Sequence, residues 1–533
     1  MDRKEPVSDN SADQSEGGVE SSRRHLLKSL GVAGLALPAL SACTEPKPPE
    51  QPDPLDMGLE IDRGDSNYES WRTQLSWHGT ASRRKPVKIV RPNRVEQVAD
   101  AVRYARDEGL KISVKSGGHN YYESWMRNDA LLVDMHDFRH VEVDPQSSSA
   151  WVGTSIWSYS LLMALKPHNL AFPISTCATL SMGGYIMGGG IGYGWQDWGM
   201  ACHNVLAVEV VTADGEILIA SADKHSDLFW AARGGIAGFP GIVTRWKLQC
   251  HPDPEAVRVT TKIFPLSQLD EVVGATQAIG QRQMGGVHLH AIVVPSPMVG
   301  AVFLPPEEAA SLGLTDSHVC LIEGYVFADS QTAAAQITDD AFSDEVFGRS
   351  VATTTNEGKG LISVYQELKG REVTFVDQKC VPVWSDKPVE SLNAVLETLL
   401  DSPANAAYLA FLINGRDMHR DGACHSMARA GSGSMSFYGV WFNDNEESTA
   451  AWASRMGDLL DPLAEGFYIN EVDCFRHPEQ VEKSYSADNW QRLKAVNTSH
   501  DPSGVFHTFP GFVRSQEPLP PEFTAANPLP PPL

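Results

Sequence analysis

His119 and Cys177 are the two side chains whose surroundings best suit covalent chemistry. Each lies in a glycine-rich turn. Glycine pairs let backbone N–H groups approach a phosphate where a Cβ would collide, and they permit positive φ. Imidazole and thiol groups are nucleophiles. The first turn contains Lys115, Ser116, Gly117, Gly118, His119 and Asn120, and the second contains Cys177, Thr179, Leu180, Ser181, Gly183 and Gly184. The pattern indicates a phosphate-binding site with two nucleophiles beside it.

Either turn alone is weak evidence for a ligand site. Gly-Gly pairs are common in loops, and a single His or Cys is more often a packed residue than a ligand. A third run, 188–192, includes Gly189 and Gly190. It fits a backbone that passes close to a ligand, and the alternative is a flexible hairpin loop. The order and spacing of the turns carry more weight than any one of them.

The flanks of these turns carry a resemblance over roughly residues 83–515, sharpest over 112–245. They include 141–145, 204–211 and 227–235, and then 241–244 with Ile242 and Val243. With the two turns they resemble the flavin-binding domain of the berberine-bridge-enzyme-like oxidoreductases, in the vanillyl-alcohol-oxidase superfamily. Asn489 begins a segment similar to the closing part of that family.

The resemblance implies an α+β fold. A two-part FAD-binding domain of the p-cresol-methylhydroxylase type would be joined to an α/β substrate domain with an antiparallel sheet. We expect a signal over 1–43, a linker and N-terminal arm over 44–82, the FAD-binding domain over 83–254, the substrate domain over 255–465, a C-terminal segment returning to the FAD domain over 466–515, and a Pro-rich tail over 516–533.

The resemblance also implies the cofactor, FAD. His119 would bond the 8α-methyl carbon of the flavin and Cys177 its C6 position, and residues 116–120 would hold the pyrophosphate. The other expected cofactor contacts are Lys115, Thr179, Leu180, Ser181, Gly183, Gly184, Gly189, Gly190, Ile242, Val243 and Asn489. The sequence shows no metal site.

Oxidation of an alcohol also needs a base that removes the hydroxyl proton as hydride leaves. The family often places it late in the chain, at the second tyrosine of Tyr-x-Asn-Tyr-x-Asp. Here the segment is Tyr468-Ile469-Asn470-Glu471-Val472-Asp473, so Glu471 stands at the base position. The alternative is a surface glutamate at the end of a strand. Tyr468 and Tyr438 are further candidates for orienting the substrate.

Leu180 occupies a position that resembles the oxygen gate of the family, where a long side chain obstructs oxygen. We therefore expect a dehydrogenase that passes electrons to a quinone or protein acceptor rather than to O2. The substrate would be a sugar or a secondary metabolite with an alcohol or hemiacetal carbon. Two alternatives are oxidative ring closure on an alkaloid- or polyketide-like molecule, and a solute-binding lipoprotein whose flavin fold has lost catalysis.

The N-terminus resembles an export signal. Arg23-Arg24 is typical of the twin-arginine route, an apolar stretch over 30–40 is too short to span a membrane, and Cys43 ends a lipobox-like sequence. We expect a periplasmic or cell-surface protein whose contact with the membrane is a lipid anchor at Cys43. The twin-arginine route carries folded proteins, which suits a protein that acquires its cofactor in the cytoplasm.

The bulk properties exclude one class of partner. The chain has 533 residues and a formal net charge of −24, which argues against nucleic acid because phosphate backbones demand clustered Lys and Arg. The basic cluster 83–85 is most simply a solvated face. The eight cysteines show no CxxC spacing, and we expect at most one or two disulfides.

Several segments have the periodicity of the elements that must position these residues. Helical spacing predicts helices over 95–107, 158–165 and 389–400, and alternation predicts strands over 112–114, 131–134, 150–152 and 206–212. Apolar runs at 319–326 and 408–413 belong to the expected substrate domain.

Overall fold

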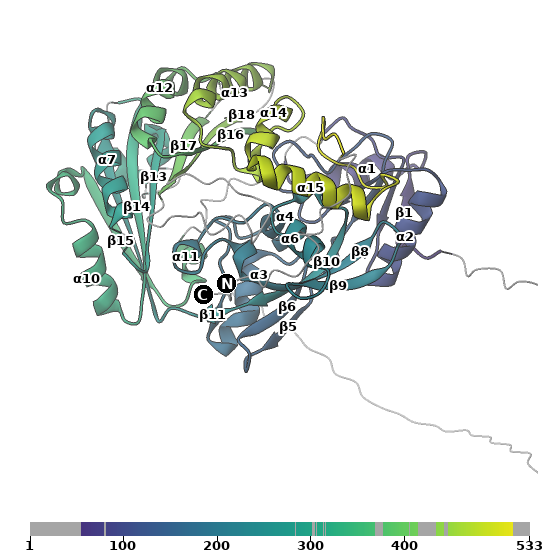
Figure 1. Cartoon of the computed structure of the whole chain (residues 1–533). Coiled ribbons are helices and arrows are strands. Elements are labelled where there is room, and N and C mark those ends of the chain that lie inside the picture. Colours follow the sequence, from purple (N-terminus) through teal and green to yellow (C-terminus); the bar gives the residue numbers. More distant parts are fainter. Residues whose placement is uncertain are drawn as a thin grey trace, which may run out of the picture. The chain divides into compact units, whose positions relative to one another are not determined.

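Figure 1 shows the computed structural model of the chain, which describes residues 55–78, 82–282, 284–300, 304, 306–312, 314, 316–367, 377–403, 406–413, 433–441 and 446–514. These residues belong to one unit, which extends from Pro54 onward. The expected signal, the expected lipid-attachment residue Cys43 and the expected tail lie outside the described residues.

The first sheet ends at the turn that contains His119. Its strand order is β1-β2-β4-β3, with β2 and β3 both parallel to β4. Its elements are β1 (Leu59–Asp62), α1 (Tyr68–Gln74), β2 (Lys88–Arg91), α2 (Val95–Asp107), β3 (Ile112–Lys115) and β4 (Leu131–Asp134). Helix α2 has the bounds predicted from the sequence, and its apolar face, including Val98 and Val102, is buried. It provides the crossover that parallel strands require.

The second sheet is antiparallel, with the order β5-β6-β10-β8-β9. Its strands are β5 (Val141–Asp144), β6 (Ser149–Gly153), β8 (Val205–Thr212), β9 (Ile217–Ser221) and β10 (Gly241–Gln249). Between them lie α3 (Ser158–Leu165), α4 (Met182–Met187), α5 (Trp195–Trp198) and α6 (Ser226–Ala232), and the short β7 (Leu170–Ala171) pairs with β11 (His251–Pro252). The turn with Cys177 leads directly into α4.

The third sheet has seven antiparallel strands in the order β15-β12-β14-β13-β17-β18-β16. The strands are β12 (Ala256–Pro265), β13 (Val287–Pro295), β14 (His318–Ala328), β15 (Ala352–Gly358), β16 (Asp377–Ser385), β17 (Ala406–Ile413) and β18 (Gly433–Trp441). Helices α7 (Leu269–Gln281), α10 (Gln331–Ala341), α12 (Pro388–Leu400) and α13 (Glu446–Leu460) pack on this sheet (Figure 1). The shorter α8 (Ser296–Met298), α9 (Pro306–Ser311) and α11 (Ser363–Glu367) lie in its connections.

Alternation along β18 decides which side chains face the helices. A Cβ at Gly439 would meet Trp452 of α13 at 2.8 Å, so the odd-numbered positions of β18 point toward that helix. Ser436 and Tyr438 belong to the other set of positions, because successive side chains of a strand point to opposite faces. The hydroxyl groups of Ser436 and Tyr438 therefore lie on the face of the sheet that points away from α13.

The last segment of the chain packs back on the first two sheets. It contains the short turn η8 (Ile469–Glu471), α14 (Pro478–Lys483) and α15 (Ala487–His500). Asn497 in α15 donates to the carbonyl of Gly238 at 3.0 Å, and Phe506 pairs with Ile112 of β3 through a parallel bridge. This return brings residues 468–471 next to elements that are far away in the sequence.

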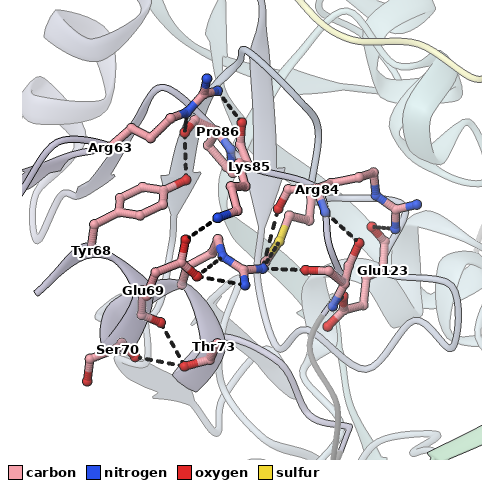
Figure 2. A network of polar contacts seen from close by, with 12 residues as sticks. Arg63, Tyr68, Glu69, Ser70, Thr73, Arg84, Lys85, Pro86 and Glu123 are labelled. Carbon is pink, nitrogen blue, oxygen red and sulfur yellow. Dashed lines mark hydrogen bonds and ion pairs between the residues drawn. The ribbon is translucent and has the colours of Figure 1, made fainter.

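Polar contacts tie α1 to the loop before β2 (Figure 2). The Tyr68 hydroxyl donates to the carbonyl of Pro86 at 2.6 Å, and Lys85 Nζ donates to Glu69 Oε1 at 2.6 Å. The N-terminal arm is thereby fixed on the first sheet.

Arg84 continues this network toward the loop after His119. Its Nη2 donates to the carbonyls of Tyr122 and Glu123, and its guanidinium lies 4.2 Å from the ring centroid of Phe475. Burial lowers the pKa of Arg84. The prediction of a solvated basic face is therefore wrong for Arg84, which is half-buried, while Arg83 and Lys85 are exposed.

None of the six cysteines that the structure describes forms a disulfide: Cys177, Cys202, Cys250, Cys320, Cys380 and Cys474. Among the described residues, no helix has the length and apolar character needed to cross a bilayer. No group of three or more His, Cys, Asp or Glu side chains suited to a metal ion occurs in this part of the chain.

Candidate active site

The first glycine turn begins where β3 ends and packs tightly against the second. A Cβ at Gly117 would lie 2.5 Å from Ser181 Oγ, and Gly118 has a φ of +78° with the carbonyl of Leu75 2.8 Å from its Cβ position. Only glycine fits both places. No described backbone or side-chain acceptor binds the N–H groups of Gly117, Gly118 and His119, and all three residues line a cavity.

The second turn is held by β6 and by the start of α3. The Gly183 N–H donates to the carbonyl of Thr154 at 2.7 Å, where a Cβ would also meet Thr154 Oγ1 at 2.3 Å. Ser175 Oγ donates to the carbonyl of Cys177 at 2.6 Å. Gly184 differs from these tightly packed positions, because a Cβ there would meet no atom within 4 Å.

Both turns line one cavity of about 330 Å³, a size typical of ligand sites. The cavity brings together most of the residues singled out in the sequence: Lys115, Ser116, Gly117, Gly118, His119, Asn120, Cys177, Leu180, Ser181, Gly183, Gly184, Ile242, Val243, Tyr438, Tyr468 and Glu471. Thr179, Gly189, Gly190 and Asn489 are not among its lining residues. Asn489 lies buried in the first turn of α15.

His119 and Cys177 approach each other at one wall of this cavity. The Nε2 atom of His119 lies 3.9 Å from Cys177 Sγ, and Thr179 Oγ1 lies 3.3 Å from Nε2 and 3.6 Å from Sγ. The Trp77 ring lies against the imidazole, with the centroids 4.2 Å apart and the ring planes tilted by 32°. Burial, with smaller contributions from His78 and Lys115, lowers the pKa of His119 to about 3. The imidazole is therefore neutral and keeps a nucleophilic lone pair at neutral pH.

Lys115 is paired rather than free in the cavity wall. Its Nζ lies 3.1 Å from Asp134 Oδ1, and both side chains are buried. Nζ also donates to the carbonyl of Ser116 at 3.0 Å. The ion pair fixes the first residue of the turn to the neighbouring strand β4.

The glycine run 188–192 is determined by contacts within the protein. A Cβ at Gly188 would lie 2.0 Å from Asn470 Oδ1, and one at Gly192 would lie 2.0 Å from the carbonyl of Ile174. Gly190 has a φ of +80° and packs on Ala201 and Tyr185. Gly189 and Gly190 are not among the lining residues of the cavity, whereas Ile191 of the same run lines it, so the closeness of this run to a ligand stays a prediction.

Glu471 lines the same cavity and accepts three hydrogen bonds there. Ser436 Oγ donates to Oε2 at 2.6 Å, Cys380 Sγ donates to Oε2 at 3.3 Å, and the Tyr438 hydroxyl donates to Oε1 at 3.1 Å. Glu471 keeps part of its surface open, but burial of its carboxyl raises its pKa, and the three donors oppose that rise. The glutamate is therefore part of the cavity wall and not a solvated strand end.

Tyr468 and Asn470 connect Glu471 with the first glycine turn. Asn470 Nδ2 donates to the Tyr468 hydroxyl at 2.9 Å, and Asn120 Nδ2 donates to the carbonyl of Asn470 at 3.0 Å. Burial raises the pKa of Tyr468 above the usual tyrosine value, so its hydroxyl stays protonated.

Sequence reasoning missed Ser436, Cys380 and Tyr121. The Tyr121 ring meets that of Tyr438 edge to face at 5.8 Å between centroids. Ser436 and Cys380 are 35 and 91 residues away from Glu471, and no local pattern marks them. Two tryptophans, Trp77 and Trp125, also line the cavity.

Comparison with known proteins agrees with this geometry. A family model described as an FAD binding domain matches residues 86–221. FAD-linked oxidoreductase ptmO of Penicillium ochrochloron is 31% identical over 345 residues, which cover 64% of this chain and 72% of ptmO. The chain belongs to the berberine-bridge-enzyme-like FAD-linked oxidoreductases.

Another relative of this FAD-linked oxidoreductase is matched over less of its length. FAD-linked oxidoreductase janO of Penicillium janthinellum is 35% identical over 200 residues, 38% of this chain and 44% of janO. Among solved structures, BBE-like 1 of Physcomitrella patens has a TM-score of 0.72 at 22% identity, covering 87% of this chain and 96% of that one. Phl p 4, a grass pollen allergen with glucose dehydrogenase activity, has a TM-score of 0.71 at 19% identity, covering 85% and 96%. Their likeness confirms the expected two-domain α+β fold.

The cavity of this FAD-linked oxidoreductase offers places for FAD that protein atoms leave unfilled. Three buried polar atoms of lining residues, Ser113 Oγ, Trp125 Nε1 and Tyr185 Oη, have no hydrogen-bond partner among the described residues. The three amides of the first turn and the open space beside Gly184 supply a cradle of the kind that a phosphate occupies. The residues present therefore fit FAD.

Proposed function

We propose that the protein carries its flavin through covalent bonds to His119 and Cys177 and oxidises an alcohol or hemiacetal carbon of a sugar or secondary metabolite. The observation that carries the proposal is one cavity lined by these two nucleophiles and by Glu471. When bound, FAD supplies a two-electron acceptor for the substrate hydride. The residues supply attachment, orientation and proton removal.

The surroundings of His119 suit its role as a nucleophile. With the pKa lowered to about 3 the ring is neutral, and it needs one nitrogen with a free lone pair. We propose that Nε2–H donates to Thr179 Oγ1, which lies 3.3 Å away, and that Nδ1 keeps the lone pair. Trp77 holds the ring plane from one side.

Glu471 is the proposed base. Its carboxylate is the one group in the Tyr468–Asp473 segment that accepts hydrogen bonds from Ser436, Cys380 and Tyr438 within the described structure. A raised pKa makes a carboxylate a stronger proton acceptor, which is what removal of a hydroxyl proton requires. Tyr438 would hold the carboxylate in place and contribute an aromatic wall for the substrate.

We propose a dehydrogenase rather than an oxidase, with a quinone or protein as electron acceptor. Leu180 lines the cavity and is half-buried, so its side chain can obstruct oxygen. Phl p 4 is named a glucose dehydrogenase and a single-residue variant of it a glucose oxidase, which supports control of oxygen reactivity by one side chain in this fold.

We also propose export through the twin-arginine route and lipid attachment at Cys43. The motifs Arg23-Arg24 and Cys43 support this. Cell fractionation of a Cys43→Ser variant tests the anchor: the protein should move from the membrane fraction to the soluble periplasmic fraction. Unchanged membrane association would contradict lipidation.

Acid precipitation tests the central proposal and separates an enzyme from a binding lipoprotein. The yellow colour should stay with the precipitated polypeptide, and its mass should exceed that of the apoprotein by one FAD. Adding candidate alcohols anaerobically should then bleach the flavin. A bare polypeptide mass, with all pigment in the supernatant, would refute covalent attachment.

A further inference from the structure

Glu471 is surrounded by neutral hydrogen-bond donors contributed by two neighbouring strands. Ser436 Oγ and Cys380 Sγ both donate to Oε2, at 2.6 and 3.3 Å, and Tyr438 donates to Oε1. Ser436 and Cys380 are almost completely buried, at 3% and 2% exposure. Both carboxylate oxygens of Glu471 thus accept hydrogen bonds, one at Oε1 and two at Oε2.

Strand register builds this arrangement. Cys380 of β16 pairs directly with Tyr438 of β18, and Ser436 pairs with Pro382. Ser436 and Tyr438 share a face because they are two positions apart, and cross-strand partners also point to the same face. The Cys380 backbone is fixed in turn, because its N–H donates to the Tyr122 hydroxyl at 3.2 Å and its carbonyl accepts from the same hydroxyl.

We propose that Ser436 and Cys380 are positioning residues that aim Glu471 at the substrate and keep its carboxylate ionised despite burial. This inference rests on the proposed role of Glu471 as the base. The donors belong to the substrate-domain sheet, so the docking of that sheet against residues 468–471 assembles a competent base.

The chemistry of the donors matches this task. A lysine or arginine beside Glu471 would form an ion pair and make the carboxylate a poor proton acceptor. Hydroxyl and thiol donors stabilise the negative charge less, so the carboxylate is ionised yet still basic. Burial keeps the pKa of Cys380 well above the usual thiol value, and the thiol therefore remains a donor.

The titratable groups that act on Glu471 come from three elements. Cys380 and Tyr438 face it from the sheet, Tyr468 lies in its own segment, and Tyr122 approaches from the loop after His119. Burial raises the pKa of Cys380, Tyr468 and Tyr122, so these groups stay neutral. Burial also raises the pKa of Glu471, which is the one carboxyl group among these four side chains.

Ser436→Ala in the flavin-loaded enzyme is the decisive variant. Loss of a hydrogen bond to a carboxylate should move the acidic limb of kcat/KM upward by about one pH unit. Ser434→Ala is the matched control, because Ser434 lies two positions away on the same buried strand and its Oγ has no partner among the described residues. Ser436→Thr keeps the hydroxyl group, so the acidic limb of its kcat/KM profile should lie at the same pH as in the wild type.

A second readout does not depend on turnover. Infrared titration follows the C=O band of the protonated Glu471 carboxyl, assigned by its loss in Glu471→Gln. The pH midpoint of this titration should rise in Ser436→Ala and, by a smaller amount, in Cys380→Ala. It should stay unchanged in the two controls, Ser434→Ala and Cys320→Ala. Cys320 is a fully buried thiol on β14 and serves as the control for Cys380.

The outcomes distinguish this inference from the proposed function. If Glu471→Gln is inactive and Ser436→Ala titrates like the wild type in both readouts, the inference is overturned and the base assignment stands. If Glu471→Gln keeps nearly full turnover, the base assignment itself fails. A shift of equal size in Ser434→Ala would show a general loosening of β18 and would also overturn the inference.

Discussion

The Nε2 atom of His119 lies 3.9 Å from the Sγ atom of Cys177, although 58 positions separate the two residues in the chain. One residue follows a parallel strand of the first sheet and the other follows the short strand β7. Thr179 Oγ1 contacts both. The imidazole and the thiol therefore lie side by side at the wall of one cavity.

Replacing His119 or Cys177 should each remove one covalent bond. We expect His119→Ala and Cys177→Ala to retain acid-stable flavin through the remaining bond, and the double variant to release all of it. Cys202→Ala, at a buried cysteine that does not line the cavity, is the control and should behave like the wild type. Intact-protein mass spectrometry and the colour of the acid precipitate measure the result, and acid-stable flavin in the double variant would contradict the assignment.

Glu471→Gln should lower kcat by roughly 10²- to 10⁴-fold, because general base catalysis typically contributes that much. Flavin content should not change, since the substitution preserves shape and leaves both linkage residues intact. Steady-state kinetics with a bleaching substrate measure the effect. Glu482→Gln, at an exposed position of α14, is the control, and comparable activity of the two variants would count against Glu471.

The same substitution should stabilise the fold at neutral pH. Burial raises the pKa of Glu471 in the folded state, so its ionisation costs stability once the pH exceeds the unfolded value of about 4.3. Gln removes this cost. We expect Glu471→Gln to have a higher Tm than the wild type at pH 7 to 8, and the difference to disappear as the pH falls below about 4. A lower Tm at pH 8 would show that the carboxylate is not strained by burial.

Gly184→Val should abolish flavin binding while leaving the fold intact. A Cβ at Gly184 meets no protein atom within 4 Å, but it would project into the cavity. Gly274→Val in α7 is the control, because that position is equally open and does not line the cavity. The ratio of flavin to protein absorbance, together with the circular dichroism spectrum, reports the outcome. A fully loaded Gly184→Val variant would place the cofactor elsewhere.

Leu180→Val should speed reoxidation of the substrate-reduced enzyme by air. The wild type should be reoxidised faster by a soluble quinone than by O2, because Leu180 fills part of the cavity wall. Stopped-flow absorbance of the flavin and a peroxide assay measure both reactions. Rapid stoichiometric peroxide formation by the wild type would identify an oxidase instead.

Local sequence patterns predicted the helices and strands well where the apolar repeat extended over many residues. Helix α2 has its predicted bounds because its apolar residues repeat at helical spacing and the face that they form is buried. The strand before His119 was predicted over 112–114 and extends by one residue to Lys115, whose ion pair with Asp134 favours the extended backbone.

The glycine run 188–192 shows the limit of local patterns. Its composition suggested a ligand, and in the structure three of its glycines pack on Asn470, Ala201 and Ile174 while Ile191 lines the cavity. A position that requires glycine shows only that some atom lies close to the backbone, and that atom can belong to a ligand or to the protein. Only the fold distinguishes the two.

The sequence by itself determined which residues are candidates for the two nucleophiles and the base, because glycine turns, a histidine, a cysteine and a glutamate can be recognised from their sequence neighbours. The tertiary structure decided what surrounds them. Ser436 and Cys380 reach Glu471 across 35 and 91 residues through strand register and the return of the last segment, and no repeat or motif encodes such a contact. Their influence on the carboxylate comes from burial and hydrogen bonding, which arise only when distant segments pack together.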